Sequence, residues 1–274
     1  MYGYIDWCKQ AGMTQLDPWN RHLSSRQELF ANLYNPWDQR MAEGGDDDDN
    51  EFLESVKDAA DRAGIPFGCI AVDGAHIFAS TAEERSINRA AAHKWIAVAR
   101  KLGARQVRVD AGGPDELPER ILAIIVEGYR ELIEYASQQN VQVLMENHWG
   151  PTKYPTNVIR ILESVDGLGF LFDTNNWMPE LQQDAWAMCA PYATLSHIKT
   201  FRFDAQGNDP SVDVAKAVEL LLDAGFAGVW GIESCPEEID EREGAAKTLH
   251  LIQRLLRGRP TADRGDHEDR HAER

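Results

Sequence analysis

Helical and strand-like stretches follow one another along most of the chain. Residues 52–65 carry apolar side chains at helical spacing, and this stretch contains Gly64, a residue type common at helix ends. Residues 66–74 are mostly apolar or small and predict a buried strand. The same order repeats as far as the last predicted helix, residues 241–257. Regular alternation with short connections is typical of parallel βαβ units.

The repeat also predicts where the other helices and strands lie. Helices are expected at residues 82–104, 118–140, 156–167, 180–190 and 212–226. Strands are expected at residues 106–112, 141–148, 168–176, 193–200 and 228–234. Near the N-terminus, residues 4–13 predict a helix and residues 14–19 a short strand, so the pattern contains seven strands in all.

The predicted fold class is α/β, a (β/α)8 TIM barrel, which has eight strands. Because the helix at residues 4–13 begins almost at Met1, the first barrel strand is expected to be missing or truncated at the N-terminus. Residues 1–258 are expected to form one barrel domain. Residues 35–50 predict a long exposed loop, and residues 259–274 predict a polar, disordered tail.

The composition narrows the partners that the protein can have. The chain has 274 residues, 43% of them hydrophobic, and a formal net charge of −17. A surface so negative repels phosphate backbones, so no nucleic-acid partner is expected. The sequence has no secretory leader and no apolar run of about 18 residues, the length that crosses a membrane. With four widely spaced cysteines and no C-x-x-C pair, a cytoplasmic location without a membrane partner is expected.

Four consecutive predicted strands end in a side chain that can bind a metal ion. These residues are Glu146 in "VLMEN", Asp173 in "FLFDTNN", His197 in "LSHIKT" and Glu233 in "WGIES". In a parallel α/β barrel the carboxyl ends of the strands surround one mouth. The four side chains are therefore expected to converge there.

A divalent metal ion is the simplest reason for this set of residues. Three carboxylates at one point repel one another unless a cation neutralises them. One imidazole with three carboxylates favours Mn²⁺ or Mg²⁺, with Co²⁺, Fe²⁺ and Zn²⁺ as alternatives. Asp73 and Asp110 also follow predicted strands, so an aspartate at a strand end is common in this chain. The inference is therefore weaker for Asp173 than for the glutamates and the histidine.

Taken together, the motifs "MENH", "FDTNN", "SHIKT" and "GIES" resemble the sugar phosphate isomerase/epimerase family of xylose isomerase-like TIM barrels. The resemblance extends over residues 4–257. It implies that Glu146 and Glu233 are both metal ligands and the catalytic acid/base pair. The implied reaction passes through a metal-stabilised enediolate of a sugar, keto-sugar or cyclitol. The resemblance also implies a homo-oligomer with a small-molecule carbohydrate substrate.

Two positions beside these motifs differ from the ketose epimerases of that family. Where those enzymes have Asp-x-x-His, this chain has Asn176, which can hydrogen-bond a substrate oxygen but cannot readily carry a proton. Arg202 stands one position away from the substrate-binding arginine of the family. Both residues are candidates for substrate binding.

Other polar and aromatic residues near the strand ends are further candidates. Lys199 can hold a substrate oxygen or carboxylate, although a supporting or surface lysine is the alternative. His148 can orient Glu146 or contact the substrate, although a hydrogen-bonded loop histidine is the alternative. Indole faces stack on sugar rings, although each indole can equally pack in the core. The tryptophans in these loops are Trp19, Trp37, Trp149 and Trp177, and the last two directly follow strands that carry ligands.

Three functions are compatible with these residues. The resemblance favours a divalent-metal-dependent isomerase/epimerase. A metal-dependent dehydratase or 3-keto-glycoside lyase would use the same ligands and is favoured by Lys199 and Asn176. A non-catalytic sugar- or metal-binding barrel is the third. Endonuclease IV relatives have the same barrel, but they need a basic face and more histidines on earlier strands, where this chain has only His76.

Overall fold

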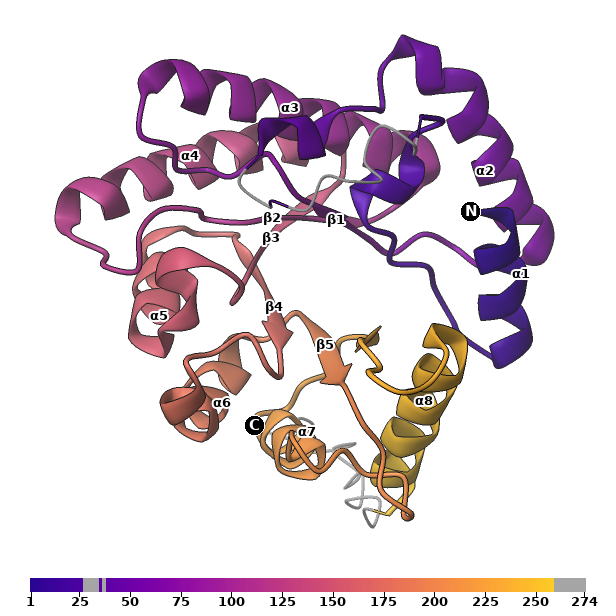
Figure 1. Cartoon of the computed structure of the whole chain (residues 1–274). Helices are drawn as coiled ribbons and strands as arrows, with labels where there is room; N and C mark the ends of the chain where they lie inside the picture. Colours follow the sequence, from indigo (N-terminus) through magenta and orange to yellow (C-terminus); the bar gives the residue numbers. More distant parts are fainter. Residues whose placement is uncertain (27–34, 36–37, 259–274) are drawn as a thin grey trace, which may run out of the picture.

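Six parallel strands form one curved sheet in the described part of the chain, which comprises residues 1–26, 35 and 38–258 of the computed structural model. The strands are β1 (Cys69–Val72), β2 (Gln106–Val109), β3 (Gln142–Glu146), β4 (Gly169–Asp173), β5 (Leu195–Thr200) and β6 (Trp230–Ser234). Each strand pairs in parallel with the next one in the sequence (Figure 1). All carboxyl ends therefore lie at the same edge of the sheet.

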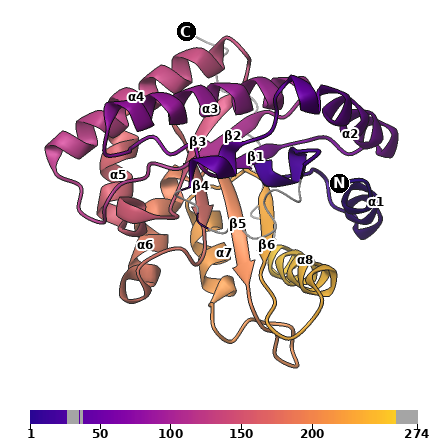
Figure 2. The same ribbon diagram turned by 45° about the horizontal axis from the view of Figure 1, so that its top comes forward.

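Helices cover the outer face of the sheet (Figures 1 and 2). They are α1 (Tyr2–Ala11), α2 (Asn50–Ala63), α3 (Ala82–Leu102), α4 (Glu119–Ser137), α5 (Pro155–Ser164), α6 (Gln182–Cys189), α7 (Val214–Asp223) and α8 (Glu241–Arg257). Short 3-10 helices are η1 (Asn20–Leu23), η3 (Gln39–Ala42), η4 (Asp47–Asp49), η5 (Gly150–Lys153), η6 (Pro179–Leu181) and η7 (Ala190–Tyr192). The predicted alternation of helices and strands from residue 52 onward is confirmed. None of the described helices is long and apolar enough to cross a bilayer.

Local sequence signals explain where several of these helices begin and end. Gly64 follows α2 with a φ of 66°, and its N–H donates to the carbonyl oxygens of Ala60 and Asp61. Thr81 and Glu84 form a capping box at the start of α3, in which each side chain accepts a hydrogen bond from the other residue's backbone N–H. These capping residues therefore fix where α2 ends and where α3 begins.

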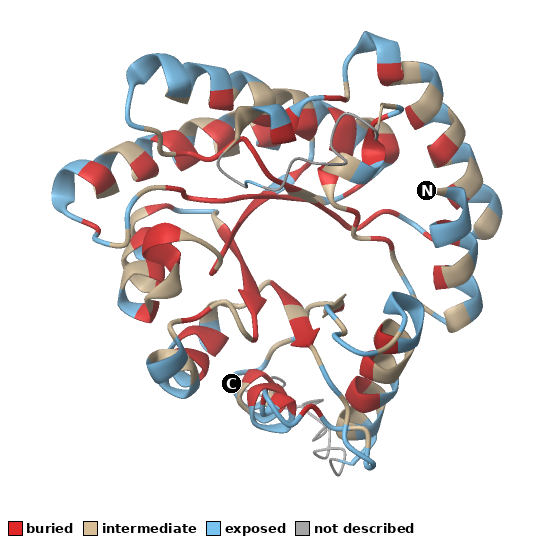
Figure 3. Cartoon of the chain, in the orientation of Figure 1, coloured by how far each residue is buried: buried red, intermediate tan, exposed pale blue. Residues whose placement is uncertain are grey.

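The two faces of the sheet differ in what they contact. Successive side chains of a strand point to opposite faces. The outward set, which includes Val143, Phe170 and Phe172, belongs to the large core beneath the helices. The inward set forms a second, small cluster of Cys69, Leu144, Leu171 and Leu195. Figure 3 shows that the strands are mostly buried while the outer helix surfaces are exposed. On each strand, the residue two positions after the inner-cluster member points to the same face and lies nearer the carboxyl end.

The expectation of seven strands was wrong by one. Residues 14–19 lie beside β1 but form only two isolated parallel bridges, Leu16 with Phe67 and Trp19 with Ala71. Pro18 has no N–H to donate to a ladder. The Asp17 carboxylate, rather than a carbonyl oxygen, accepts the hydrogen bond of the Cys69 N–H, at 2.7 Å. The named strands are therefore six of the eight that a complete (β/α)8 barrel has.

The sheet is open on the far side of β6. Within residues 1–26, 35 and 38–258, β6 ends the sheet and has a partner strand only in β5. A groove of about 430 Å³ separates β6 and α8 from α1 and the segment around Asp17. The burial of β6 is correspondingly incomplete, since only Gly231 among its five residues is buried.

Residues 38–50 do not form the wholly exposed loop that their composition predicts. They contain η3 and η4, and Met41, Ala42 and Asp49 are buried. Asp49 accepts hydrogen bonds from the backbone N–H groups of Ser25, at 2.8 Å, and Gly45, at 2.9 Å. A buried carboxylate satisfied in this way holds the segment against the rest of the fold. The predicted tail at residues 259–274 and Trp37 lie outside the described residues.

Candidate metal centre

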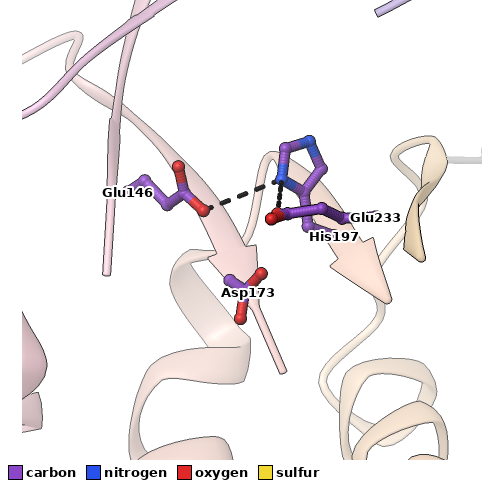
Figure 4. Close-up of side chains that lie close together, drawn as sticks. All are labelled: Glu146, Asp173, His197 and Glu233. Carbon is purple, nitrogen blue, oxygen red and sulfur yellow. Dashed lines mark hydrogen bonds and ion pairs between the residues drawn. The ribbon is translucent and has the colours of Figure 1, made fainter. Parts of the chain in front are cut away.

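Glu146, Asp173, His197 and Glu233 come together at the carboxyl ends of β3 to β6 (Figure 4). One ligand atom of each residue lies within 4.8 Å of the ligand atoms of the other three. Glu146 and Asp173 each follow an inner-cluster leucine by two positions, so the alternation along the strands carries them to the inner face. The predicted convergence of these four side chains is therefore what the fold shows.

His197 contacts both glutamates. Its Nδ1 lies 3.1 Å from Oε2 of Glu233 and 3.7 Å from Oε1 of Glu146. Burial disfavours the charged imidazole, but these two carboxylates raise the pKa of His197 to about 10. In the absence of a metal ion, the protonated ring therefore supplies part of the positive charge that the glutamates need.

Asp173 is buried with one oxygen left free of hydrogen bonds. Its Oδ1 accepts the backbone N–H groups of Asn175, at 2.6 Å, and Asn176, at 2.9 Å. Its Oδ2 is buried and has no hydrogen-bond partner among the described residues. Burial raises the pKa of Asp173 to about 6, against the opposing charge of Lys199. A buried carboxylate oxygen with no hydrogen bond, close to two other carboxylates and with the Lys199 ammonium as a counter-charge at 3.5 Å, can serve as a cation ligand, so the donor set fits a divalent ion.

Lys199 and Asn176 lie inside the same cluster. The Nζ of Lys199 is 2.8 Å from Oε1 of Glu233 and 3.5 Å from Oδ2 of Asp173. It also donates to Oδ1 of Asn176 at 3.0 Å, while Nδ2 of Asn176 lies 3.3 Å from Oε1 of Glu146. Although burial opposes ionisation, the contact with His197 and the charge of Lys199 hold the pKa of Glu233 well below its usual range. Lys199 and Asn176 thus directly contact members of the group of four.

A second group of charged residues adjoins the first; His148 was a predicted candidate, but the grouping of these residues was not predicted. It consists of Asp73, Arg108, Asp110 and His148, all on or directly after β1, β2 and β3. The Nδ1 of His148 lies 2.9 Å from Oδ2 of Asp110 and 3.9 Å from Oε2 of Glu146. His148 is therefore held chiefly by Asp110. The sequence signal was Arg108, a charged residue between the two valines of β2.

A cavity of about 290 Å³ opens beside these ligands. Glu146, His197 and Glu233 line it together with Arg108 and His148 from the second group. Trp19 and Trp149 also line it, as their loop positions predicted. The volume is at the small end of the range of about 300–1,000 Å³ usual for small-molecule sites.

Two predicted substrate-binding residues lie elsewhere. Trp177 is 4% exposed and packs against Phe170 and Phe172 in the core beneath the helices. The side chain of Arg202 is 55% exposed and pairs with Glu237 at 2.6 Å. Neither side chain lines the cavity.

Asn147 ties the end of β3 to the end of β4. Its side chain donates to the carbonyl oxygen of Asp173 at 2.9 Å and accepts the N–H of Asp173 at 2.8 Å. The Asn147 amide therefore takes the place of a neighbouring strand's backbone as the hydrogen-bond partner of both the N–H and the C=O of Asp173. This role was missed because Asn147 acts on the backbone of Asp173 and is distinguishable only by its hydrogen bonds.

We expect Asn147→Ala to weaken metal binding about 10- to 100-fold, since it frees the backbone that aims Asp173. The loss of both hydrogen bonds should also lower the free energy of unfolding by about 1–3 kcal/mol. Calorimetric titration with Mn²⁺ and denaturant melts measure the two effects. Asn175→Ala is the control, since the described structure records a hydrogen bond for its backbone N–H and none for its side chain. Equal metal affinities in the two variants would contradict the role assigned to Asn147.

Comparison with known proteins matches this architecture to one family and to several solved structures. The sequence model described as xylose isomerase-like TIM barrel matches residues 5–255. The structure of a 3-keto-D-glucoside 4-epimerase from E. coli is similar, with a TM-score of 0.68 at 12% identity, over 92% of this chain and 94% of that one. A probable 3-DHS dehydratase from Bacillus anthracis has a TM-score of 0.65 at 13% identity, over 92% of each chain.

A third solved structure carries a metal ion. It is a xylose isomerase-like TIM barrel protein from Mycobacterium smegmatis in complex with magnesium, with a TM-score of 0.64 at 18% identity, over 93% of this chain and 87% of that one. No curated protein matches the sequence. At identities this low the structural likeness supports the fold alone, while the match over residues 5–255 covers most of the chain.

Proposed function

Because the chain belongs to the xylose isomerase-like TIM barrel family, we propose that it is a divalent-metal-dependent isomerase or epimerase of a sugar, keto-sugar or cyclitol. The observation that carries the proposal is the group of four ligand atoms within 4.8 Å of one another beside a cavity of about 290 Å³. Solved structures of this fold include sugar epimerases and a dehydratase, which supports an enzyme.

Glu146, Asp173, His197 and Glu233 would hold the ion. One imidazole and three carboxylates form an oxygen-rich set, which favours Mn²⁺ or Mg²⁺ over ions that prefer thiolates. The magnesium complex of a similar barrel supports this choice. When bound, a divalent ion supplies positive charge that stabilises the anion formed as a proton leaves the carbon beside a carbonyl group.

The two glutamates are suited to different parts of the proton transfer. Glu233 lines the cavity and its side chain is 36% exposed, so it can reach a substrate carbon. Glu146 is 1% exposed and is held by Arg108, Asn176 and His197. We assign Glu233 as the group that removes the proton and Glu146 as the group on the other side of His197 that returns one. Trp19 and Trp149 would cover the apolar face of the ring.

A dehydratase or lyase on the same residues is the second candidate. Asn176 has no proton to exchange, and it contacts both Glu146 and Lys199. Lys199 would then hold an oxygen of the substrate while a hydroxyl or glycosyl group leaves from the neighbouring carbon. The solved dehydratase structure of this fold supports this alternative.

Solvent deuterium exchange tests the proposal. The purified protein is loaded with Mn²⁺, assayed for metal content, and incubated in deuterium oxide with ketoses and keto-cyclitols. A stoichiometric ion together with deuterium at a carbon beside the carbonyl group would support an isomerase or epimerase. Loss of water or of a glycosyl group would select the lyase. If no ion is retained from Mn²⁺, Mg²⁺, Co²⁺ or Zn²⁺, the enzyme proposal is overturned and a non-catalytic binding protein replaces it.

A further inference from the structure

Arg108 lies among three buried carboxylates. Its side chain projects from the middle of β2 on the inner face of the sheet, beside Leu144 of β3. The Nη1 atom is 2.8 Å from Oδ1 of Asp73 and 3.1 Å from Oδ2 of Asp110. The Nε atom is 2.9 Å from Oε2 of Glu146, so Arg108 contacts a proposed metal ligand directly.

The two aspartates beside Arg108 would, together with His148, make a donor set for a metal ion. Asp73, Asp110 and His148 each offer one ligand atom within 4.8 Å of the others. All these side chains are largely buried, and Oδ1 of Asp110 has no hydrogen-bond partner among the described residues. Such a group cannot remain ionised without a cation. The guanidinium supplies that cation from within the chain, and it stays protonated near neutral pH.

We propose that Arg108 is a positioning residue that takes the place of a second divalent cation among Asp73, Asp110 and His148, next to Glu146. By occupying this position, Arg108 limits the carboxyl-end edge of the sheet to one metal ion. It also positions Glu146, because Oε2 lies 2.9 Å from Nε of Arg108 while Oε1 lies 3.7 Å from Nδ1 of His197. The inference rests on the proposed metal site and adds a specificity for one ion to it.

The number of Mn²⁺ ions bound per chain tests the proposal, measured by elemental analysis and titration. Wild type is expected to bind one ion. Arg108→Gln is expected to bind two, and the electron paramagnetic resonance spectrum is expected to show a spin-coupled pair. The double variant Arg108→Gln with Asp110→Asn should return to one ion. Arg160→Gln is the control, since Arg160 pairs at the surface with Glu119, and it should bind one ion.

Each other outcome has a separate meaning. No ion in wild type overturns the proposed function itself. Two ions in wild type, or one uncoupled ion in Arg108→Gln with one in wild type, overturns the role of Arg108 and leaves the proposed function standing.

A second variant decides the case in which Arg108→Gln does not fold with or without Mn²⁺. Arg108→Lys keeps the charge but presents one ammonium, which cannot meet three carboxylates at once. It is expected to bind one ion with an affinity about 10- to 100-fold lower than wild type. An affinity equal to that of wild type would overturn the proposal.

Discussion

Glu233→Gln is expected to lower the rate of deuterium incorporation about 10²- to 10⁴-fold, the usual contribution of a positioned general base. Among the three acidic ligands, Glu233 has the most exposed side chain, at 36%, and it lines the cavity. Glutamine keeps its size and one oxygen but cannot accept the proton. Metal affinity should fall much less than the exchange rate, since three of the four ligands are unchanged. Mass spectrometry of the recovered sugar and Mn²⁺ titration measure the two quantities.

Two further variants separate proton transfer from metal binding. Glu146→Gln is expected to weaken the metal more than Glu233→Gln does, because Glu146 is 1% exposed and lies against Arg108. Glu237→Gln is the matched control: Glu237 follows β6 closely but pairs with Arg202 at the surface. Its exchange rate should equal that of wild type. A Glu233→Gln protein that exchanges at the wild-type rate would remove Glu233 from the reaction.

Lys199→Met is expected to destabilise the metal-free protein by about 3 kcal/mol, the lower end of the range for removing one partner of a buried ion pair. Lys199 lies 2.8 Å from Glu233 and 3.5 Å from Asp173, and it supplies much of the positive charge at the cluster. The lower end applies because the Glu233 side chain is 36% exposed and water can solvate part of its charge. Denaturant melts in the presence of a chelator give the change in unfolding free energy.

Added metal should reverse much of this loss. An ion at about 100 times its dissociation constant stabilises the native state by about 2.7 kcal/mol. Because Lys199 competes with the ion for Asp173 and Glu233, Mn²⁺ should raise the melting temperature of Lys199→Met more than that of wild type. Lys216→Met, which removes a surface pair with Glu219, should change stability by no more than about 1 kcal/mol. An unchanged stability of metal-free Lys199→Met would contradict this account.

The helices, the named strands and the convergence of Glu146, Asp173, His197 and Glu233 were predictable because each depends on local periodicity. Glu146 and Asp173 each end a run of apolar residues, and parallel strands bring such ends to one edge whatever the helices contribute. The failure at residues 14–19 has a local cause too, since Pro18 and the Asp17 side chain interrupt a ladder that the apolar pattern alone suggested. Asn176 was also predictable as a candidate, because it follows Asp173 by three positions in the sequence.

What could not be predicted depends on contacts between distant residues. Asp73 and Asp110 looked like ordinary strand ends, because nothing local shows that Arg108 lies between them. Trp177 follows a ligand-bearing strand as closely as Trp149 does, and only the three-dimensional path of the loops separates a core indole from one at the cavity. Spacing along the chain places a residue near the mouth, but the direction of its side chain is set by packing.

The open side of the sheet has a consequence for how the site is lost. Strand β6 has a partner only in β5 among the described residues, and four of its five residues are incompletely buried. Local opening needs less free energy where backbone hydrogen bonds and buried contacts are few. Amide hydrogens of β6 should therefore exchange faster than those of β3 and β4, and opening of β6 carries Glu233 away from the other ligands. If the proposed ion binds, its lifetime should depend on local opening of β6 rather than on global unfolding. Substitutions in α8 that loosen β6 would then speed metal release while the fold persists.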